Sequence, residues 1–557
     1  MTSPTPSISS RYPAEMVEEF YRQGFWQRAT LGELVEQRAT TTPDAPFISD
    51  STSALTYGAL RDRAFGLAAG LRRGGLLAGD RVAVQLPNWT DFAVVMVAAA
   101  RIGAVTVPVM PIFRHDEVRY ILEHSGARVA VTPGEFRGFD YAAMYREIRA
   151  GLPELHSVVV ARGDPGHDDS LDGLVVPGTP EALADELGPG PGPDDGHITI
   201  YTSGTTSRPK GCYHTWNTAL FSARMMAEQL DCTGSDVAFG PSPVTHSTGY
   251  ITSVLIPLIV GASSHLMEVW EPAEALQRIE QHRCTYAVTA TAFLQMLLAV
   301  HRPEEHDPAT IRFWVAAGAP IPASVVEDAR RMFRGAKILS LYGRSENFVT
   351  TMCTIDDAEE RSTSSDGCAQ SGVDIAVVGS DGRELPRGEE GDIAYRGPGH
   401  MIEYFGDPAE TTALFTADGH SRSGDLGRMD GDGYVRVTGR LKDIIIRGGQ
   451  NISAREIEEH LLLHPGVANV AVVAMPDPRL GERACAYVVP APGVTGLSLE
   501  DVVTFLKERR IAVQKLPERL EVVEALPMTA TGKIQKHVLR ADVAGKLESE
   551  AAPDPTR

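Results

Sequence analysis

Residues 201–211 read Tyr-Thr-Ser-Gly-Thr-Thr-Ser-Arg-Pro-Lys-Gly, and this stretch decides the fold and much of the chemistry. It continues the β-branched run Ile198–Tyr201, which predicts a strand that ends in a loop of hydroxyl residues, glycine and one lysine. Such a loop presents backbone N–H groups, hydroxyls and the Lys210 ammonium to phosphate oxygens. The spacing is not G-x-x-x-x-G-K-[ST], which excludes a P-loop NTPase. The sequence therefore predicts a phosphate site of another kind at the end of a strand.

The string T-S-G-T-T-x-x-P-K-G within this stretch is also highly specific. It fixes eight positions. At roughly one in twenty per position, a chance match occurs on the order of 10⁻¹⁰ times per start site. A polar surface turn is therefore not an adequate explanation of the segment.

Outward from this loop, the chain alternates helical patterns with short β-branched runs. We predict helices at Ala64–Arg73, Phe92–Arg101 and Glu117–His124, and strands at Arg81–Gln85, Ala104–Val109 and Ala127–Thr132. Such alternation indicates βαβ units and a mostly parallel sheet. The acidic, then Gly/Pro-rich run Glu181–Gly196 is typical of a linker. A second α/β region is expected from Ile198 to about Gly343.

The C-terminal part has a different pattern. A β-rich stretch covers Val373–Thr438, and after Arg440 a small α+β domain is predicted. Its expected elements are a helix at Ala454–Leu463, strands at Val467–Met475 and Ala484–Pro490, and a helix at Ser498–Arg509. The predicted fold class is α/β, with a large N-terminal domain at residues 1–440 and a small, mobile α+β domain at residues 441–557.

Composition agrees with a large acidic globular protein and narrows its partners. The chain has 557 residues, 43% hydrophobic and 22% charged, with a net charge of −21 from 52 basic and 73 acidic residues. This balance argues against nucleic acid or an anionic membrane as a partner. The six cysteines are scattered and form no C-x-x-C pair, which is typical of free thiols in a reducing compartment. No stretch has the character of a signal peptide or of a membrane-spanning helix. We therefore expect a cytoplasmic protein.

Five further segments follow the first in an order that one enzyme superfamily keeps. They are Ala316–Pro322 (AAGAPIP), Tyr342–Asn347 (YGRSEN), Ser423–Gly427 (SGDLG), Gly439–Ser453 (GRLKDIIIRGGQNIS) and Pro527–Ile534 (PMTATGKI). Together the six segments resemble the motifs of the adenylate-forming superfamily, which includes acyl- and aryl-CoA synthetases, peptide-synthetase adenylation domains and luciferases. The resemblance extends from about residue 30 to residue 541.

The resemblance implies ATP as a substrate and assigns a role to each motif. The implied nucleotide-binding residues are Thr202, Ser203, Gly204, Thr205, Thr206, Lys210, Gly318, Ala319, Pro320, Tyr342, Gly343, Asp425, Arg440 and Lys442. Among them, Asp425 is expected on the ribose hydroxyls and Lys442 at an interdomain hinge. Glu346 is implied as the Mg²⁺ ligand, a hard oxygen donor for a metal that also contacts phosphate.

The same resemblance implies the catalytic and acid-binding residues. The catalytic set is Lys533, Ser345, Glu346 and His246, where Lys533 is the adenylation lysine and Ser345 replaces the usual threonine. The carboxylate pocket is expected at His246, Tyr250, Thr291, Ala316 and Gly343. Small residues at 316 and 343 are expected to leave room for a ring.

The opening YRQGFWQRATLGELVEQRA and the VPVMPIFRHDEVRYIL segment resemble the acid–CoA ligases of alicyclic, aromatic or medium-chain acids, such as cyclohexanecarboxylate-CoA ligases. This resemblance implies AMP-forming transfer of the acyl group to CoA. Two alternatives stay open: a stand-alone enzyme that loads an acid onto a carrier protein, and a diazotase-like enzyme that adenylates nitrite. The sequence identifies neither the acid nor the oligomeric state.

Overall fold

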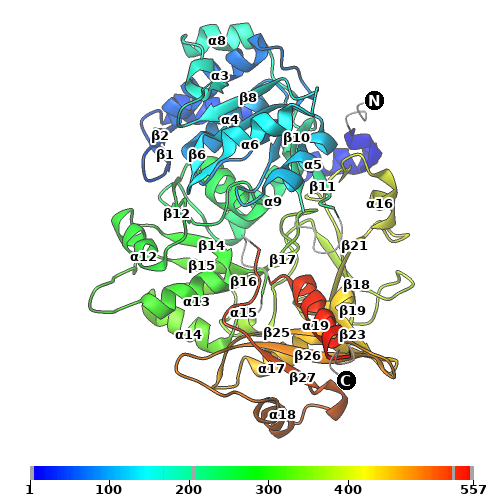
Figure 1. Cartoon of the computed structure of the whole chain (residues 1–557). Helices are drawn as coiled ribbons and strands as arrows, with labels where there is room; N and C mark the ends of the chain where they lie inside the picture. The colour runs from blue at the N-terminus through cyan, green and yellow to red at the C-terminus, as the bar shows by residue number, and fades with distance from the viewer. Residues whose placement is uncertain (1–5, 167, 203–207, 320, 530–533, 552–557) are drawn as a thin grey trace. The chain divides into compact units, whose positions relative to one another are not determined.

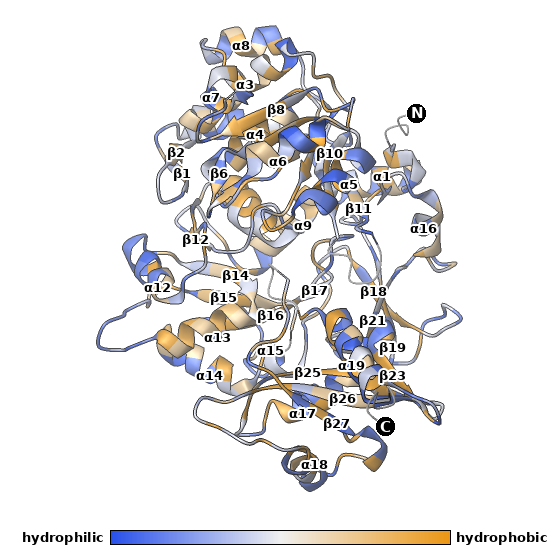
Figure 2. Cartoon of the chain, in the orientation of Figure 1, coloured by the Kyte–Doolittle hydropathy of each residue, from blue (hydrophilic) through white to orange (hydrophobic). Residues whose placement is uncertain are grey.

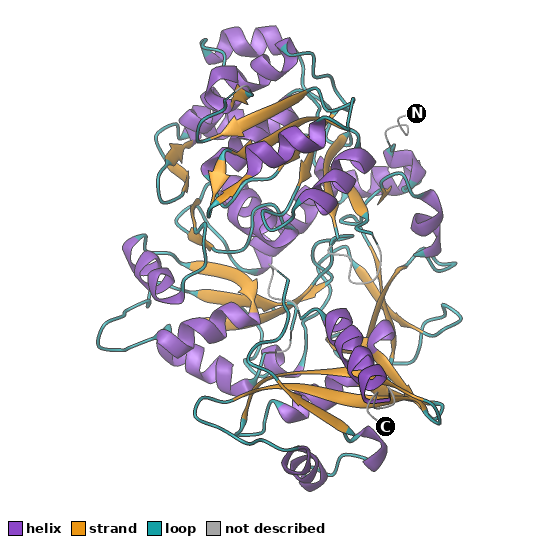
Figure 3. Cartoon of the chain, in the orientation of Figure 1, coloured by secondary structure: helices purple, strands orange, loops and turns teal. Residues whose placement is uncertain are grey.

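The computed structural model describes residues 6–166, 168–202, 208–319, 321–529 and 534–551. These residues form two compact units, each visible in Figure 1. Unit 1 runs through Thr202 and continues over Pro209–Asp374 and Arg396–Phe415. Unit 2 holds Ile375–Tyr395 and the chain from Thr416 onward. Helices and strands alternate along the chain (Figure 3), which confirms the predicted α/β class.

The N-terminal sheet of unit 1 has eight strands in the order β20-β11-β10-β4-β3-β5-β8-β9. Their bounds are β3 Arg81–Val84, β4 Val105–Pro108, β5 Ala127–Pro133, β8 Ser157–Ala161, β9 Asp169–Ser170, β10 Gly196–Tyr201, β11 Gly211–Thr215 and β20 Glu403–Tyr404. The strands from β10 to β9 are parallel, whereas β11 pairs antiparallel with both β10 and β20. The valine-rich runs of β3, β5 and β8 suit parallel strands buried on both faces.

The middle sheet of unit 1 also has eight strands, in the order β17-β16-β15-β14-β12-β13-β1-β2. Their bounds are β1 Pro46–Ser49, β2 Ala54–Thr56, β12 Val237–Gly240, β13 Ser263–Leu266, β14 Tyr286–Ala290, β15 Phe313–Ala317, β16 Lys337–Tyr342 and β17 Thr351–Met352. Its central strands are parallel, so their carboxyl ends meet at one edge, where ligands bind in open α/β sheets. A separate hairpin pairs β6 Glu135–Phe136 with β7 Phe139–Asp140.

Helices cover these sheets. The α-helices of unit 1 are α1 Ala14–Arg22, α2 Leu31–Thr41, α3 Tyr57–Arg73, α4 Thr90–Arg101, α5 His115–Ser125, α6 Tyr141–Arg149, α7 Leu171–Leu174, α8 Pro180–Leu187, α9 Trp216–Gln229, α10 Ser247–Gly249, α11 Ile256–Val260, α12 Pro272–Gln281, α13 Thr291–Val300, α14 Ala323–Met332, α15 Arg361–Ser364 and α16 Pro408–Ala413. A π-helical turn spans Tyr250–Leu255, and a 3₁₀ turn spans Ile8–Ser10.

In Figure 2 the strands β8, β14 and β15 are hydrophobic, whereas α5 and α12 show mostly hydrophilic residues. No helix among the described residues is long and apolar enough to cross a bilayer.

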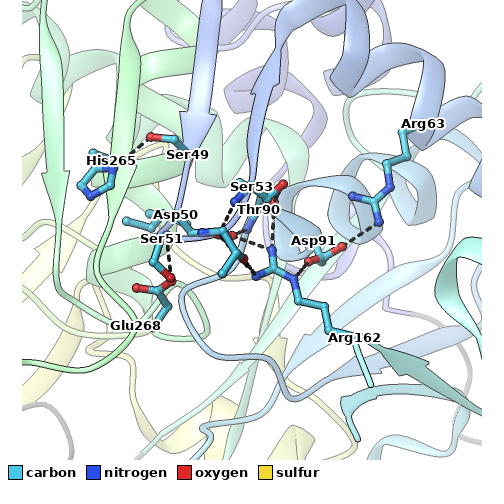
Figure 4. Close-up of polar contacts among 12 residues, drawn as sticks. Ser49, Asp50, Ser51, Ser53, Arg63, Thr90, Asp91, Arg162, His265 and Glu268 are labelled. Atoms are coloured by element: carbon cyan, nitrogen blue, oxygen red, sulfur yellow. Dashed lines mark hydrogen bonds and ion pairs between the residues drawn. The ribbon is translucent and has the colours of Figure 1, made fainter. Parts of the chain in front are cut away.

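A buried ion-pair network ties the two sheets of unit 1 together (Figure 4). Arg162 follows β8, and its guanidinium contacts Asp50, which follows β1, at 2.6 Å and Asp91 of α4 at 2.7 Å. The side chains of Asp50 and Asp91 are 0% and 2% exposed, and the guanidinium lies 4.5 Å from the Trp89 ring centroid. Asp91 has a second partner in Arg63, at 2.9 Å, whereas the charge of the buried Asp50 carboxylate is balanced by Arg162.

Unit 2 contains two sheets. A four-stranded sheet has the order β18-β19-β21-β22, and a five-stranded sheet has β24-β23-β26-β25 with β27 paired to β26. The strands are β18 Asp374–Val378, β19 Gly391–Arg396, β21 Ser421–Met429, β22 Val435–Arg440, β23 Ile444–Arg447, β24 Gln450–Ser453, β25 Val467–Asp477, β26 Gly481–Pro490 and β27 Arg519–Val522. The helices are α17 Ala454–Leu461, α18 Leu499–Glu508 and α19 Lys536–Ala551, with 3₁₀ turns at Leu441–Asp443 and Val513–Lys515.

The structure corrects one element of the sequence prediction. The run Glu181–Gly196 is not a linker between domains, because its first half belongs to helix α8 and its last residue begins β10. Thr179 caps α8 through its side chain and Pro180 stands at the first helical position, a start signal that the acidic composition obscured. Arg73 of α3 pairs with Glu186 of α8, so this segment packs within unit 1.

Candidate active site

The loop that opened the sequence analysis connects two antiparallel strands. Tyr201 of β10 lies opposite Gly211 of β11, so the chain returns along the neighbouring strand. Two main-chain groups link the two strand ends: Thr202 N–H donates to the Lys210 carbonyl at 2.9 Å, and Lys210 N–H donates to Thr202 Oγ1 at 3.2 Å. The predicted phosphate ligands Ser203, Gly204, Thr205 and Thr206 lie outside the described residues, and their role stays a prediction.

Lys210 extends from this loop over an aromatic ring. Its Nζ lies 4.9 Å from the ring centroid of Tyr404 and pairs with the carboxylate of Glu410. Its side chain is 33% exposed, so the ammonium remains accessible to a ligand. A cation over an aromatic face is stabilised by the ring quadrupole. The predicted phosphate cation is thus held on β20 and α16.

Glu346 meets the same tyrosine. The Tyr404 hydroxyl donates to Glu346 Oε1, and among the described residues Tyr404 is the only side chain that hydrogen-bonds this carboxylate. Tyr404 is 5% exposed, and burial together with the Glu346 charge raises the pKa of its hydroxyl. No group of three or more potential metal-ligating side chains occurs among the described residues. One half-buried carboxylate beside a phosphate site fits Mg²⁺, which uses few protein ligands together with substrate phosphates.

The main chain itself requires a glycine at position 343. A Cβ at Gly343 would lie 2.0 Å from the Phe348 carbonyl oxygen, so the chain must turn back over this position. The turn places Phe348 at φ 59° and is closed by Phe348 N–H, which donates to the Arg344 carbonyl at 2.7 Å. The glycine therefore makes room for the main chain that carries Ser345 and Glu346, and its predicted place in the acid pocket stays a prediction.

Residues at the carboxyl end of β15 are brought together with α13. The Thr291 hydroxyl at the start of α13 donates to the Ala319 carbonyl at 3.0 Å. Gly318, which directly follows β15, has a φ of 79°, and this turns the chain away from the strand. Ala316 is fully buried in a core cluster with Trp314 and Leu294. Pro320 lies outside the described residues.

His246 and Tyr250 lie in one short helical segment but in different surroundings. His246 caps α10, where its Nδ1 accepts a hydrogen bond from Thr248 N–H at 3.3 Å, and it is partly exposed. Tyr250 is fully buried, and its hydroxyl lies 2.6 Å from Nε2 of His197 on β10. Burial lowers the pKa of His197 to about 3, so this ring is neutral. Tyr250 and His197 thus form a buried polar pair.

Of the remaining predicted residues, Tyr342 ends β16 in unit 1, and the others belong to unit 2. Asp425 of β21 and Arg440 of β22 are cross-strand neighbours, and Arg440 Nε lies 2.9 Å from Asp425 Oδ1. Ser423 and Gly424 donate three hydrogen bonds to Asp392 Oδ1, which fixes the main chain of β21 just before Asp425. Lys442 lies in the 3₁₀ turn that follows β22. Lys533 lies outside the described residues.

Sequence reasoning did not identify Tyr404 or His214. Tyr404 reaches the site because β20 pairs with β11, with Tyr404 opposite Cys212, although the two strands are far apart in sequence. His214 of β11 lies 2.8 Å, through Nε2, from the carbonyl of Ser345. Neither residue belongs to a chemical motif. The one signal is spacing: His214 comes four residues after Lys210, and residues an even number apart along an extended chain face the same side.

Comparisons with known proteins agree with the motifs. The family model described as AMP-binding enzyme matches residues 35–405, and the AMP-binding enzyme C-terminal domain matches residues 456–533. A medium-chain fatty-acid–CoA ligase of Escherichia coli (strain K12) is 38% identical over 543 residues, covering 96% of this chain and 94% of that protein. A 2,3-dihydroxybenzoate-AMP ligase of Bacillus subtilis (strain 168) is 31% identical over 543 residues, with 96% and 98% covered.

A solved structure gives the same result for the fold. ATP-bound MatB from Rhodopseudomonas palustris superposes with a TM-score of 0.79 at 27% identity, covering 92% of this chain and 98% of that chain. The large N-terminal and small C-terminal parts expected from the sequence are confirmed by the two matched models. ATP and CoA as substrates and Mg²⁺ as the metal are those of this family. The chain belongs to the AMP-binding enzyme family, in the acyl- and aryl-CoA ligase branch of the adenylate-forming superfamily, and is an AMP-forming acyl-CoA synthetase.

Proposed function

We propose that the protein adenylates a medium-chain, alicyclic or aromatic carboxylic acid with ATP and transfers the acyl group to CoA. The observation that carries this proposal is the meeting of Lys210 and Glu346 at Tyr404. A predicted phosphate cation and a predicted metal carboxylate, distant in sequence, lie on one aromatic residue. This arrangement suits a triphosphate with its metal.

The chemistry requires two anions to approach one another. A carboxylate oxygen of the acid attacks the α-phosphorus of ATP, the bond to the bridging oxygen of the β-phosphate breaks, and pyrophosphate leaves. The thiol of CoA then attacks the acyl carbon, loses its proton, and expels AMP. Lys210 supplies positive charge to the phosphates, and oriented cations of this kind lower the barrier by stabilising the charge that develops. Mg²⁺ held by Glu346 and phosphate oxygens would neutralise further charge.

The two relatives support different acids. The Escherichia coli relative is named for medium-chain fatty acids, and the Bacillus subtilis relative for 2,3-dihydroxybenzoate. The second relative is named as an AMP ligase, which supports a further candidate, loading of an aryl acid onto a carrier protein. The two candidates share the adenylation step and differ in the thiol that accepts the acyl group.

A two-stage assay tests the proposal. Pyrophosphate release is first measured with a panel of medium-chain, alicyclic and aromatic acids, and nitrite serves as the competing substrate. The preferred acid is then incubated with ATP, Mg²⁺ and either CoA or a phosphopantetheinylated carrier protein, and the products are identified by mass spectrometry. We expect an acyl-CoA. Acylation of the carrier protein alone would favour the loading enzyme, and activity with nitrite alone would overturn acid activation.

A further inference from the structure

The main chain around Glu346 is fixed by hydrogen bonds at three successive carbonyls. The Ser345 carbonyl lies 2.8 Å from Nε2 of His214. The Glu346 carbonyl accepts Met401 N–H at 2.7 Å, and the Asn347 carbonyl accepts the Ser222 hydroxyl at 3.2 Å. The donors come from β11, from the segment before β20 and from α9. The peptide that carries Glu346 is thus held from three elements of unit 1.

His214 is fixed as a donor in this arrangement. Its ring is fully buried, lies 4.3 Å from the Phe348 ring centroid, and has the Thr218 hydroxyl 3.1 Å from Nδ1. Burial lowers the pKa of His214 to about 4, so one ring nitrogen carries the only proton at neutral pH. Because a carbonyl accepts only, that proton belongs on Nε2, and Nδ1 faces the hydroxyl of Thr218.

The Glu346 side chain is fixed separately, by Tyr404. The tyrosine hydroxyl donates to Oε1, and the ring is held on a paired strand and packed under Lys210. A carboxylate with one oxygen occupied by a phenol has its second oxygen turned toward a metal in a fixed direction. Partners that orient a metal-binding carboxylate in this way commonly change metal affinity by about 10–100-fold.

We propose that Tyr404 is a positioning residue that orients the Glu346 carboxylate for the nucleotide-bound metal, while His214 fixes the peptide from which Glu346 extends. This inference rests on the proposed function, because the metal arrives with a nucleotide. It gives a role to two residues outside the motifs, and it predicts a defect in only one part of nucleotide binding. Loss of either contact weakens the metal-dependent part of nucleotide binding and spares the metal-independent part.

The test measures binding without turnover. The probe is Mn²⁺ with α,β-methylene-ATP, whose α–β bridge cannot be cleaved to release pyrophosphate, and free Mn²⁺ is followed by electron paramagnetic resonance. Binding of the analogue in EDTA is measured in parallel by calorimetry. For Tyr404→Phe we expect Mn²⁺ affinity to fall about 10-fold or more with unchanged binding of the analogue in EDTA.

A matched control comes from the neighbouring strand. Tyr213 of β11 is also buried, and its hydroxyl makes no hydrogen bond with any residue the structure describes. Tyr213→Phe should therefore leave both measurements unchanged. His214→Leu should weaken Mn²⁺ binding, and His214→Gln, which keeps an N–H donor, should restore most of it. Tryptophan fluorescence verifies that each variant is folded.

The outcomes separate this inference from the proposed function. Normal Mn²⁺ affinity in Tyr404→Phe, or equal losses with and without metal, would overturn the positioning role while leaving the proposed function intact. A Tyr213→Phe defect as large as that of Tyr404→Phe would also overturn it. If the wild-type protein bound the analogue no better with Mn²⁺ than in EDTA, the proposed function would fail and this inference with it.

Discussion

At the residue scale, burial keeps two histidines of unit 1 neutral. His197 and His214 are deeply buried, each makes a short polar contact, and burial lowers their pKa values to about 3 and about 4. By contrast, His115 is 46% exposed beside Glu147. Neutral buried imidazoles make stability depend on pH.

Unit 1 should lose stability in mild acid. The folded-state pKa values of His197 and His214 lie below the unfolded value of about 6.5, so the unfolded state binds more protons as the pH falls. The stability gained by keeping these two rings neutral is fully present above pH 6.5 and is lost as the pH falls toward 4. Over this range the free energy of unfolding falls by about 1.4 kcal/mol per pH unit for each group. His214→Gln should reduce this slope by about 1.4 kcal/mol per pH unit.

Tryptophan fluorescence isolates this unit. All five tryptophans lie in unit 1, so urea unfolding followed by fluorescence between pH 7 and 4.5 reports on unit 1 alone. Equal slopes for the wild-type protein and His214→Gln would contradict the neutral state assigned to His214.

Asp425 carries the second prediction at this scale. If it accepts hydrogen bonds from the ribose, Asp425→Ala removes charge-assisted contacts that contribute about 1.5–3 kcal/mol each. The KM for ATP should rise at least about 10-fold, because 1.4 kcal/mol corresponds to a factor of ten. Asp432→Ala, on the exposed turn after β21, is the control for charge. An unchanged KM with normal turnover would remove Asp425 from the nucleotide site.

At the element scale, sequence periodicity predicted what is local and missed what is long-range. The predicted strand at Ala127–Thr132 and helix at Glu117–His124 correspond to β5 and α5 within two residues at each end. Hydrophobic spacing determines such elements directly. The pairing of β20 with β11 leaves no local pattern, because β20 is two residues long and comes from a distant segment. Tyr404 was missed for that reason.

The ion pairs of Arg162 with Asp50 and Asp91 likewise could not be predicted from the sequence, and they lead to a stability prediction. Arg162→Ala leaves the buried Asp50 carboxylate without its arginine, whereas Asp91 keeps its ion pair with Arg63, and removal of one partner from a buried ion pair costs about 3–5 kcal/mol. The urea midpoint of unit 1 should fall accordingly. The midpoint is used rather than the intensity, because Arg162 contacts Trp89.

A surface pair provides the control. Arg73 and Glu186 are 56% and 38% exposed, so Arg73→Ala should cost less than about 1 kcal/mol. Equal shifts in Arg162→Ala and Arg73→Ala would show that the network does not hold the two sheets together.

At the scale of the whole molecule, the motifs predicted the family, whereas the roles of the site residues and the division of the chain stay predictions. The contacts group residues 375–395 with the chain from 416 onward, whereas the motif order suggested a boundary at residue 440, which stays a prediction. Lys210, Glu346, Thr291 and Ala319 are placed in unit 1, and Asp425, Arg440 and Lys442 in unit 2. Motifs identify residue types at fixed positions, whereas unit boundaries depend on contacts between distant segments.

The predicted adenylation lysine, Lys533, gives the prediction at this scale. Lys533→Ala should slow pyrophosphate release by about 10²–10³-fold, as loss of one preorganised donor does in other enzymes. The variant should still convert a supplied acyl-adenylate to acyl-CoA. Lys536 is an unsuitable control, because its Nζ pairs with Glu458 at 2.7 Å, and the exposed Lys507 of α18 replaces it. Normal pyrophosphate release by Lys533→Ala would exclude this lysine from the first step.

The central claim is that a carboxylate oxygen of the acid bonds to the α-phosphorus of ATP, and oxygen-isotope transfer tests it most directly. The preferred acid is labelled with ¹⁸O in its carboxylate and incubated with the enzyme, ATP, Mg²⁺ and CoA, and AMP is analysed by mass spectrometry. Because the thiol expels AMP together with the oxygen that the acid contributed, we expect one ¹⁸O in each AMP and none in pyrophosphate. Formation of ADP with ¹⁸O in phosphate, or AMP without the label, would contradict acid adenylation.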